Sequence, residues 1–101
     1  MMEQRKNQRF DMRLPIEFTR SGAKTRINGQ TRNISSSGVL ITSPEMVPVG
    51  ESIEYLITFP KAPGTRAAVR LHCVGKVLRE ESEESAFAAT LERYEFRRER
   101  V

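Results

Sequence analysis

Apolar and polar residues alternate one by one through most of this chain, and this alternation restricts the fold more than any other feature. Leu14, Ile16 and Phe18 alternate with polar residues and a proline. The same period of two recurs over residues 53–59 and, at its longest, over 69–78. A period of two is typical of a β-strand with one buried face, and no long stretch shows the 3.6-residue period of an amphipathic helix. The sequence therefore predicts an all-β fold.

Short, turn-rich connections indicate how the strands are joined. The predicted strands cover residues 13–19, 25–34, 39–42, 53–59, 69–78 and 87–91, the second with an interruption near Asn28-Gly29. Connections as short as these favour antiparallel pairing, and six such strands favour a barrel. The charged segment 94–101 is predicted to form a short C-terminal helix or tail, because its arginines and glutamates are interspersed as on a solvated helix.

The size and composition of the chain limit its class. A chain of 101 residues is predicted to form one domain, and 38% hydrophobic with 30% charged residues is typical of a globular protein. No apolar run approaches the ~18 residues of a membrane span, so we expect no membrane insertion. Cys73 is the only cysteine, which excludes an internal disulfide and favours a cytoplasmic protein.

The positive charge is concentrated in the first third of the chain. Residues 1–32 hold eight basic and three acidic side chains, a balance of +5, whereas residues 33–101 hold nine basic and ten acidic ones, a balance of −1. Such a balance favours an anionic partner, which could be nucleic acid, a membrane surface or a small phosphate ligand. The alternative is a solvated basic arm without a partner.

Two short clusters narrow the choice of ligand. The first, Arg5-Lys6-Asn7-Gln8-Arg9, places two arginines four positions apart, and arginine forks bind phosphates and the Hoogsteen edge of guanine. The second, Asn33-Ile34-Ser35-Ser36-Ser37-Gly38, is a polar turn between two strands. If it is extended, Asn33 and Ser35 share one face, and Gly38 permits a positive φ or a close approach to the backbone. Each cluster alone also fits a plain solvated arm or turn.

In this order, the two clusters resemble the PilZ domain family, as does nearly the whole chain. The run Arg9-Phe10-Asp11-Met12-Arg13-Leu14-Pro15-Ile16-Glu17-Phe18 is similar to that family's link into its first strand, and the segments 73–77 and 87–92 resemble its later strands. The resemblance implies a receptor for the bacterial second messenger cyclic di-GMP. It implies that Arg5 and Arg9 bind phosphates and guanine edges, that Asn33 and Ser35 contact guanine and phosphate, and that Gly38 ends the motif.

The resemblance also implies an architecture and a mode of action. A single PilZ-like domain would span residues 1–101, with a ligand-binding arm over 1–12, a six-stranded antiparallel barrel over 13–93 and a tail over 94–101. We expect the polar, self-repelling arm to be mobile without ligand and to order against the barrel when ligand binds. Such a non-catalytic receptor would need no cofactor, would signal to an unidentified protein effector, and would be a monomer or a ligand-linked homodimer.

Other functions are less favoured by the residues. A small basic barrel that binds nucleic acid would stack bases on exposed aromatics, but Phe10 is the only aromatic near the arm. A degenerate PilZ-like domain used only for protein interaction remains an alternative. His72 has no second ligand at metal spacing and is expected at the surface, whereas Cys73 is expected in the core. No histidine is placed to activate the serines of the second cluster, so no enzyme is predicted.

Overall fold

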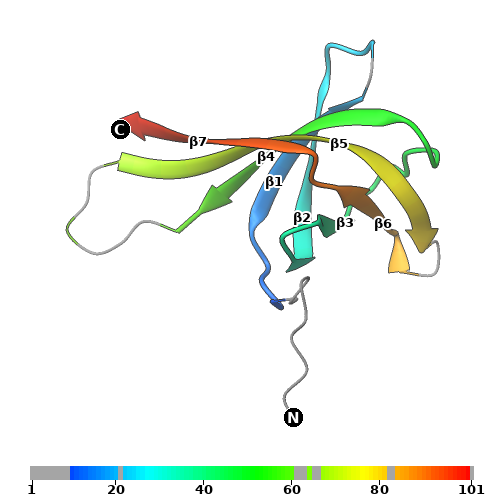
Figure 1. Ribbon diagram of the computed structural model, residues 1–101, viewed down its shortest axis with the longest axis horizontal. Coiled ribbons are helices and arrows are strands. Elements are labelled where there is room, and N and C mark those ends of the chain that lie inside the picture. Colours follow the sequence, from blue (N-terminus) through cyan, green and yellow to red (C-terminus); the bar gives the residue numbers. More distant parts are fainter. Residues whose placement is uncertain (1–9, 21, 61–63, 65–66, 82–83, 101) are drawn as a thin grey trace.

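The computed structural model describes residues 10–20, 22–60, 64, 67–81 and 84–100, and within them it contains strands and turns but no α-helix (Figure 1). The strands are β1 (Pro15–Arg20), β2 (Arg26–Ile34), β3 (Gly38–Thr42), β4 (Ser52–Phe59), β5 (Ala67–Glu81), β6 (Ala86–Thr90) and β7 (Arg93–Arg100). The predicted all-β class is confirmed, and each of the six predicted strands overlaps an observed one.

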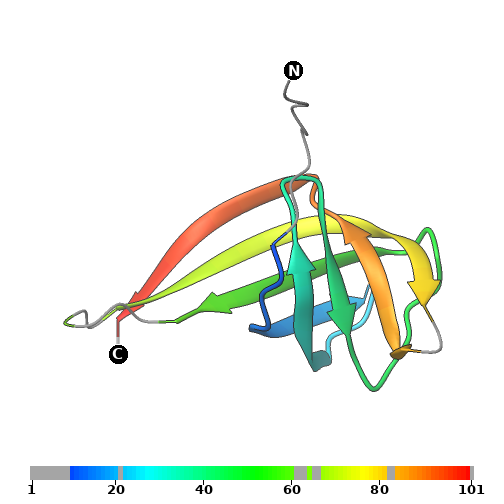
Figure 2. The same cartoon turned by 90° about the horizontal axis from the view of Figure 1, so that it is seen from below.

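Six of the strands close into a barrel. The strand order is β4-β1-β2-β3-β6-β5, every pairing is antiparallel, and pairing between β4 and β5 closes the ring. Figure 2 shows the ring on one side of the molecule and the ends of β4, β5 and β7 extending away from it. The predicted six-stranded antiparallel barrel is therefore confirmed, with β7 as an additional strand.

The barrel interior is filled by the apolar residues that alternate in the sequence. Phe18 of β1 and Phe87 of β6 meet edge to face, with their ring centroids 5.3 Å apart. Tyr55 and Cys73 lie opposite each other on β4 and β5, and both are buried. Each large buried side chain contributes about 1.5–3 kcal/mol relative to full exposure. The predicted inward face of the fifth strand, with Cys73 on it, is thus confirmed.

The second strand differs from its prediction in where it is irregular. It runs without interruption through Asn28-Gly29. A Cβ at Gly29 would lie 2.5 Å from the Thr42 carbonyl oxygen, so glycine at this position lets β2 and β3 approach closely. The irregularity lies further along, where the register with β3 shifts between Thr31 and Asn33. This shift is a β-bulge, which changes the face on which the following side chains lie.

The C-terminal segment was predicted as a helix or tail, and the helix is wrong. Residues 93–100 form β7, which pairs with residues 67–74 of β5 on the edge that β6 uses further along. The strand β5 is 15 residues long, so its first half would otherwise present an unpaired edge. Tyr94 and Phe96 alternate with charged residues, which suits a strand, and pairing with β5 satisfies backbone groups that a short isolated helix would hold only marginally.

Where the chain passes from β6 to β7, the backbone of Thr90 packs against Gly75 of β5. The Thr90 carbonyl oxygen would lie 1.8 Å from a Cβ at that position, so no larger residue fits without movement of the backbone. The hydroxyl of Thr90 accepts a hydrogen bond from the Lys76 backbone at 2.8 Å, and the Thr90 carbonyl accepts one from the Tyr55 hydroxyl at 2.9 Å. These contacts hold the crossing in place, and glycine at position 75 lets the two segments approach closely. The bend or bulge expected at Gly75 is not seen there: pairing with β4 is regular through this residue, and the register shift of β5 lies further along, between Val77 and Arg79.

Candidate functional site

The residues of the second sequence cluster line one shallow hollow on the outer surface of the barrel. Asn33 is the last residue but one of β2, Ser35 lies in the β2–β3 turn and Gly38 begins β3, and all three line this hollow of about 60 Å³. Arg5 and Arg9 lie outside the described residues. The structure therefore brings together three of the five predicted site residues on one patch of the barrel.

The bulge in β2 places Asn33 on the outer surface. Thr31 points into the barrel and is fully buried, so a regular strand would also turn Asn33 inward. After the register shift, Asn33 instead lies opposite Leu40, and Ile34 lies opposite the buried Val39. Bulges often redirect a side chain beside a functional site. The bulge leaves the Asn33 amide half-exposed, on the face expected from the sequence.

Hydrogen bonds within the turn fix its shape. The Ser35 backbone N–H donates to the Gly38 carbonyl at 2.8 Å, and the Ser35 hydroxyl lies 3.3 Å from that carbonyl and accepts from the Ser37 N–H at 3.3 Å. Gly38 is not one of the described glycines that have a positive φ. It is required because a Cβ there would lie 2.5 Å from the Ala89 carbonyl oxygen of β6. Glycine at this position therefore brings β3 and β6 close together.

The floor of the hollow is small and apolar. Leu40 and Ala88 are each 8% exposed and form, with Ala86, a separate small cluster on the outer face of β3 and β6. Leu78 of β5 lines the same hollow and is 57% exposed. A small apolar surface of this kind can pack against the flat face of a purine base. Sequence reasoning missed these residues, although short alanines at alternate positions of the 86–90 segment were visible as a signal.

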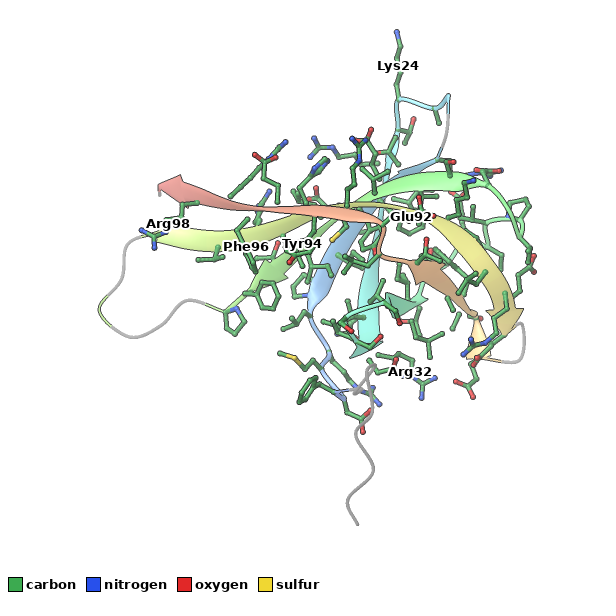
Figure 3. The ribbon with its side chains drawn as sticks, viewed as in Figure 1. Lys24, Arg32, Glu92, Tyr94, Phe96 and Arg98 are labelled. Carbon is green, nitrogen blue, oxygen red and sulfur yellow. The ribbon has the colours of Figure 1, made fainter. Side chains whose placement is uncertain are left out.

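Two arginines at or next to the hollow were also missed: one lines it, and the other is the chain neighbour of Asn33. Arg79 lines it and donates a hydrogen bond to Glu81 at 3.0 Å, and Arg32, at the bulge, forms an ion pair with Glu84 (Figure 3). Both pairs are partly exposed, so each contributes little to stability, and an anionic ligand can compete for either guanidinium.

The chain that follows the first sequence cluster is joined to this site. Phe10 and Ile34 form an antiparallel bridge, with both backbone hydrogen bonds at 2.9 Å. Ile34 stands between Asn33 and Ser35, and Phe10 is the residue directly after Arg9 in the sequence. Further along, the buried Thr31 hydroxyl accepts from the Leu14 N–H at 2.8 Å and donates to the Met12 carbonyl at 2.6 Å. Residues 10–14 are therefore held against the end of β2 that carries the site.

Residues that were not assigned to a site lie where the sequence predicted them. His72 is half-buried on the outer face, 3.3 Å from a Glu54 carboxylate oxygen. Cys73 is fully buried, and burial raises the pKa of its thiol to about 12. Burial likewise raises the pKa of the neighbouring Tyr55 phenol well above its usual value. In the described part of the chain, no group of three or more His, Cys, Asp or Glu side chains is arranged to hold a metal ion.

Larger hollows lie away from the predicted site. One, of about 260 Å³, opens beside Glu17 and Glu54, another, of about 420 Å³, lies near Gly22 and Ile53, and a third, of about 300 Å³, lies beside Tyr94. None of them is lined by a residue of the two sequence clusters. Within the described residues, no helix is long and apolar enough to cross a membrane.

Comparison with known proteins agrees with this fold. No curated protein matches the chain. Among solved structures, the Bacillus subtilis inhibitor of motility (MotI/DgrA) is similar, with a TM-score of 0.68 and 19% sequence identity over 93% of this chain and 45% of that chain. The present chain thus spans less than half the length of that protein. The family model for the PilZ domain matches residues 3–97, which include both sequence clusters and all of the barrel. The chain therefore belongs to the PilZ domain family.

Proposed function

We propose that this PilZ domain is a non-catalytic receptor for cyclic di-GMP, which it binds through Arg5 and Arg9 of the arm and Asn33, Ser35 and Gly38 of the barrel. One observation carries the proposal. The bridge between Phe10 and Ile34 ties the residue after Arg9 to the strand end that holds Asn33 and Ser35. An arm anchored at this point has its arginines within a few residues of the barrel half of the site.

The chemistry of the hollow suits one half of this ligand. Cyclic di-GMP has two phosphates and two guanines, so it needs cationic forks, short polar groups and a surface for base stacking. The Asn33 amide and the Ser35 hydroxyl offer the short polar groups, and Leu40 and Ala88 offer the apolar surface. A hollow of about 60 Å³ is far smaller than the roughly 300–1,000 Å³ of an enclosing pocket. The ligand would therefore lie across the barrel surface and need the arm as its second wall.

This arrangement supplies a mechanism for signalling. Ligand that contacts both arm and barrel stabilises the state in which the two are joined, by as much as it binds that state better. The joined surface would then be read by a protein effector, in keeping with a cytoplasmic receptor that lacks catalysis. The hydrogen bonds of Thr31 to the backbone of Met12 and Leu14 hold this part of the chain in place beside the barrel half of the site.

Calorimetric titration with cyclic di-GMP tests the proposal. We expect Arg9→Ala to weaken binding by ~2–5 kcal/mol, about 30-fold to several thousand-fold, because a ligand phosphate loses its charged partner. Arg5→Ala should behave alike. Arg13→Ala is the matched control, since it removes the same charge from an exposed arginine four residues further along. We expect its effect to be no larger than about threefold.

Two results would contradict the proposal. Wild-type-like titration by both arm variants would remove Arg5 and Arg9 from the site. Equal losses in the Arg9→Ala and Arg13→Ala variants would mean that only the net charge of the arm matters. Parallel titrations with GTP and with single-stranded DNA address the alternative of a nucleic-acid-binding barrel. Tight DNA binding with a steep salt dependence, and none of cyclic di-GMP, would support that alternative instead.

A further inference from the structure

The strand β7 presents an open edge in the described structure. One edge pairs with β5, and none of the described strands pairs with the other. Unpaired edges are ready to pair with another strand, and proteins usually protect them with prolines, bulges, charged side chains or a cover. β7 has no proline, its register with β5 is regular throughout, and its many charged side chains include both signs, so they repel a strand of like charge pattern but not a complementary one. This edge therefore calls for an explanation.

One face of β7 is apolar and exposed. Tyr94 is 63% and Phe96 is 62% exposed, and their rings meet edge to face at 6.2 Å (Figure 3). Phe96 lies opposite Leu71 and Tyr94 lies opposite Cys73, both of which face the core. The aromatic pair thus continues the inward face of the barrel beyond the point where the barrel closes. Two large aromatics left in water on an open edge are typical of an interaction surface.

The other face of β7 carries alternating charges. Glu95 and Arg97 share this face, two residues apart, and their charged groups lie 3.6 Å from each other. Both are mostly exposed, with side-chain exposures of 68% and 53%. A strand with an acid and a base on either side of a central residue is complementary to itself when it is turned around. The central residue here is Phe96.

We propose that β7 pairs edge to edge with β7 of a second copy of this chain, antiparallel, about a two-fold axis at Phe96. In this register Phe96 lies opposite Phe96. Glu95 of each copy lies opposite Arg97 of the other, and Tyr94 of each lies opposite Arg98 of the other. Residues directly opposite each other in an antiparallel pair share a face, with Cβ atoms about 4.5–5.5 Å apart. A pair of opposite charges then lies on either side of the central Phe96 pair, and an aromatic–guanidinium contact lies beyond each of them.

The neighbouring registers are unfavourable. When the two-fold axis is perpendicular to the sheet, the aromatic faces of the two β7 strands lie on the same side of the joined sheet. Only registers in which some residue lies opposite its own copy meet this condition. An axis at Glu95 would set two glutamates opposite each other, and an axis at Arg97 would set two arginines opposite each other. Like charges directly opposite are destabilising. The register at Phe96 avoids both, and it joins the β4-β5-β7 ribbons of the two copies into one continuous sheet with a shared apolar face.

Charge reversal with exchange of partners tests the register. Glu95→Arg alone sets arginine opposite Arg97, and Arg97→Glu alone sets glutamate opposite Glu95. By sedimentation velocity without nucleotide, we expect the wild type to dimerise with a Kd in the micromolar range. Each single variant should be weakened about tenfold or more, because both symmetric pairs become repulsive. An equimolar mixture of the two variants should restore the dimer, since every charge then meets its opposite across the edge.

The control and the contrary outcomes are equally specific. Lys24→Glu makes the same change of charge as Arg97→Glu on an exposed residue of the β1–β2 connection, and it should leave the wild-type Kd unchanged within about twofold. Both reversals lie on an exposed face, so circular dichroism should show a folded barrel in each. A wild type that stays monomeric at several hundred micromolar would overturn the proposal. This holds even if the monomer binds a single-stranded oligonucleotide through Tyr94 and Phe96, since the aromatic pair would then have another partner. So would a mixture that remains monomeric.

Discussion

Replacing the buried Thr31 with valine should destabilise the barrel by removing two hydrogen bonds without changing the shape of the side chain. The Thr31 hydroxyl is the acceptor for the Leu14 N–H at 2.8 Å and the donor to the Met12 carbonyl at 2.6 Å, and the side chain is fully buried. In the valine variant the Leu14 N–H keeps its buried position but loses its partner. A buried donor left unsatisfied costs about 1–3 kcal/mol.

The expected magnitude follows from these two contacts. The lost hydrogen bond to the Met12 carbonyl adds about 0.5–1.5 kcal/mol, so Thr31→Val should lower the free energy of unfolding by ~2–4 kcal/mol. That is a large part of the roughly 5–15 kcal/mol available to a domain of this size. Urea unfolding followed by circular dichroism measures the change. At an m value of about 1.5 kcal/mol per M, the midpoint should fall by about 1–3 M.

Serine at the same position separates the hydroxyl from the methyl group. Thr31→Ser keeps both hydrogen bonds and loses one methyl group, so it should cost only about 0.8–1.5 kcal/mol. Amide exchange provides a local readout, because Thr31 holds the segment that leads to the bridge between Phe10 and Ile34. The amides of that bridge should exchange faster in the valine variant than in the serine variant. A valine variant as stable as the wild type, or less destabilised than the serine variant, would refute the reasoning.

Two further predictions concern the core. Gly75→Ala should lower the free energy of unfolding by about 3 kcal/mol or more, because its Cβ would lie 1.8 Å from the Thr90 carbonyl oxygen, whereas Gly22→Ala, in open space at φ +77°, should cost only ~1–2 kcal/mol in the same urea assay. Cys73 should resist a thiol reagent at pH 8 until the protein unfolds, since burial raises its pKa from 9.0 to about 12. Because the pKa of the Cys73 thiol is higher in the folded than in the unfolded protein, the stability contributed by the protonated thiol is complete below pH 9 and is lost as the pH rises toward 12. Urea midpoints measured across that range will show this loss. Rapid labelling of the native thiol, or equal stability of the two glycine variants, would contradict these expectations.

Much of the fold could be predicted from the sequence because alternation is a local property. The pattern over 69–78 predicts a strand with Cys73 inward, and the same argument places Phe18, Tyr55 and Phe87 in the core. Turn residues predict where strands end, and short connections predict antiparallel pairing. The resemblance of the two polar clusters to the PilZ family needs only the residues and their order, so membership could be predicted before any pairing was known.

The local pattern was insufficient wherever a residue depends on a distant strand. The charges of 94–101 suit a solvated helix as well as a strand, and the open edge of β5 decided for β7. Gly38 and Gly75 read as residues of turns or bends, but their close neighbours are the Ala89 and Thr90 carbonyls, far along the chain. Arg79, which lines the hollow, gave no sequence signal, because it becomes a neighbour of Asn33 and Ser35 only when β5 and β6 pair and the barrel closes.

Sequence by itself determined that this chain folds as an antiparallel barrel and that its polar clusters resemble those of a PilZ domain, since strand period and motif order are written residue by residue. Tertiary structure alone decided that a bulge turns Asn33 outward, that Phe10 joins the β2 end beside it, and that β7 leaves an open edge. The physical reason is that register and closure depend on hydrogen bonds between residues far apart in the chain. Those bonds determine which side chains meet, and no local pattern specifies them.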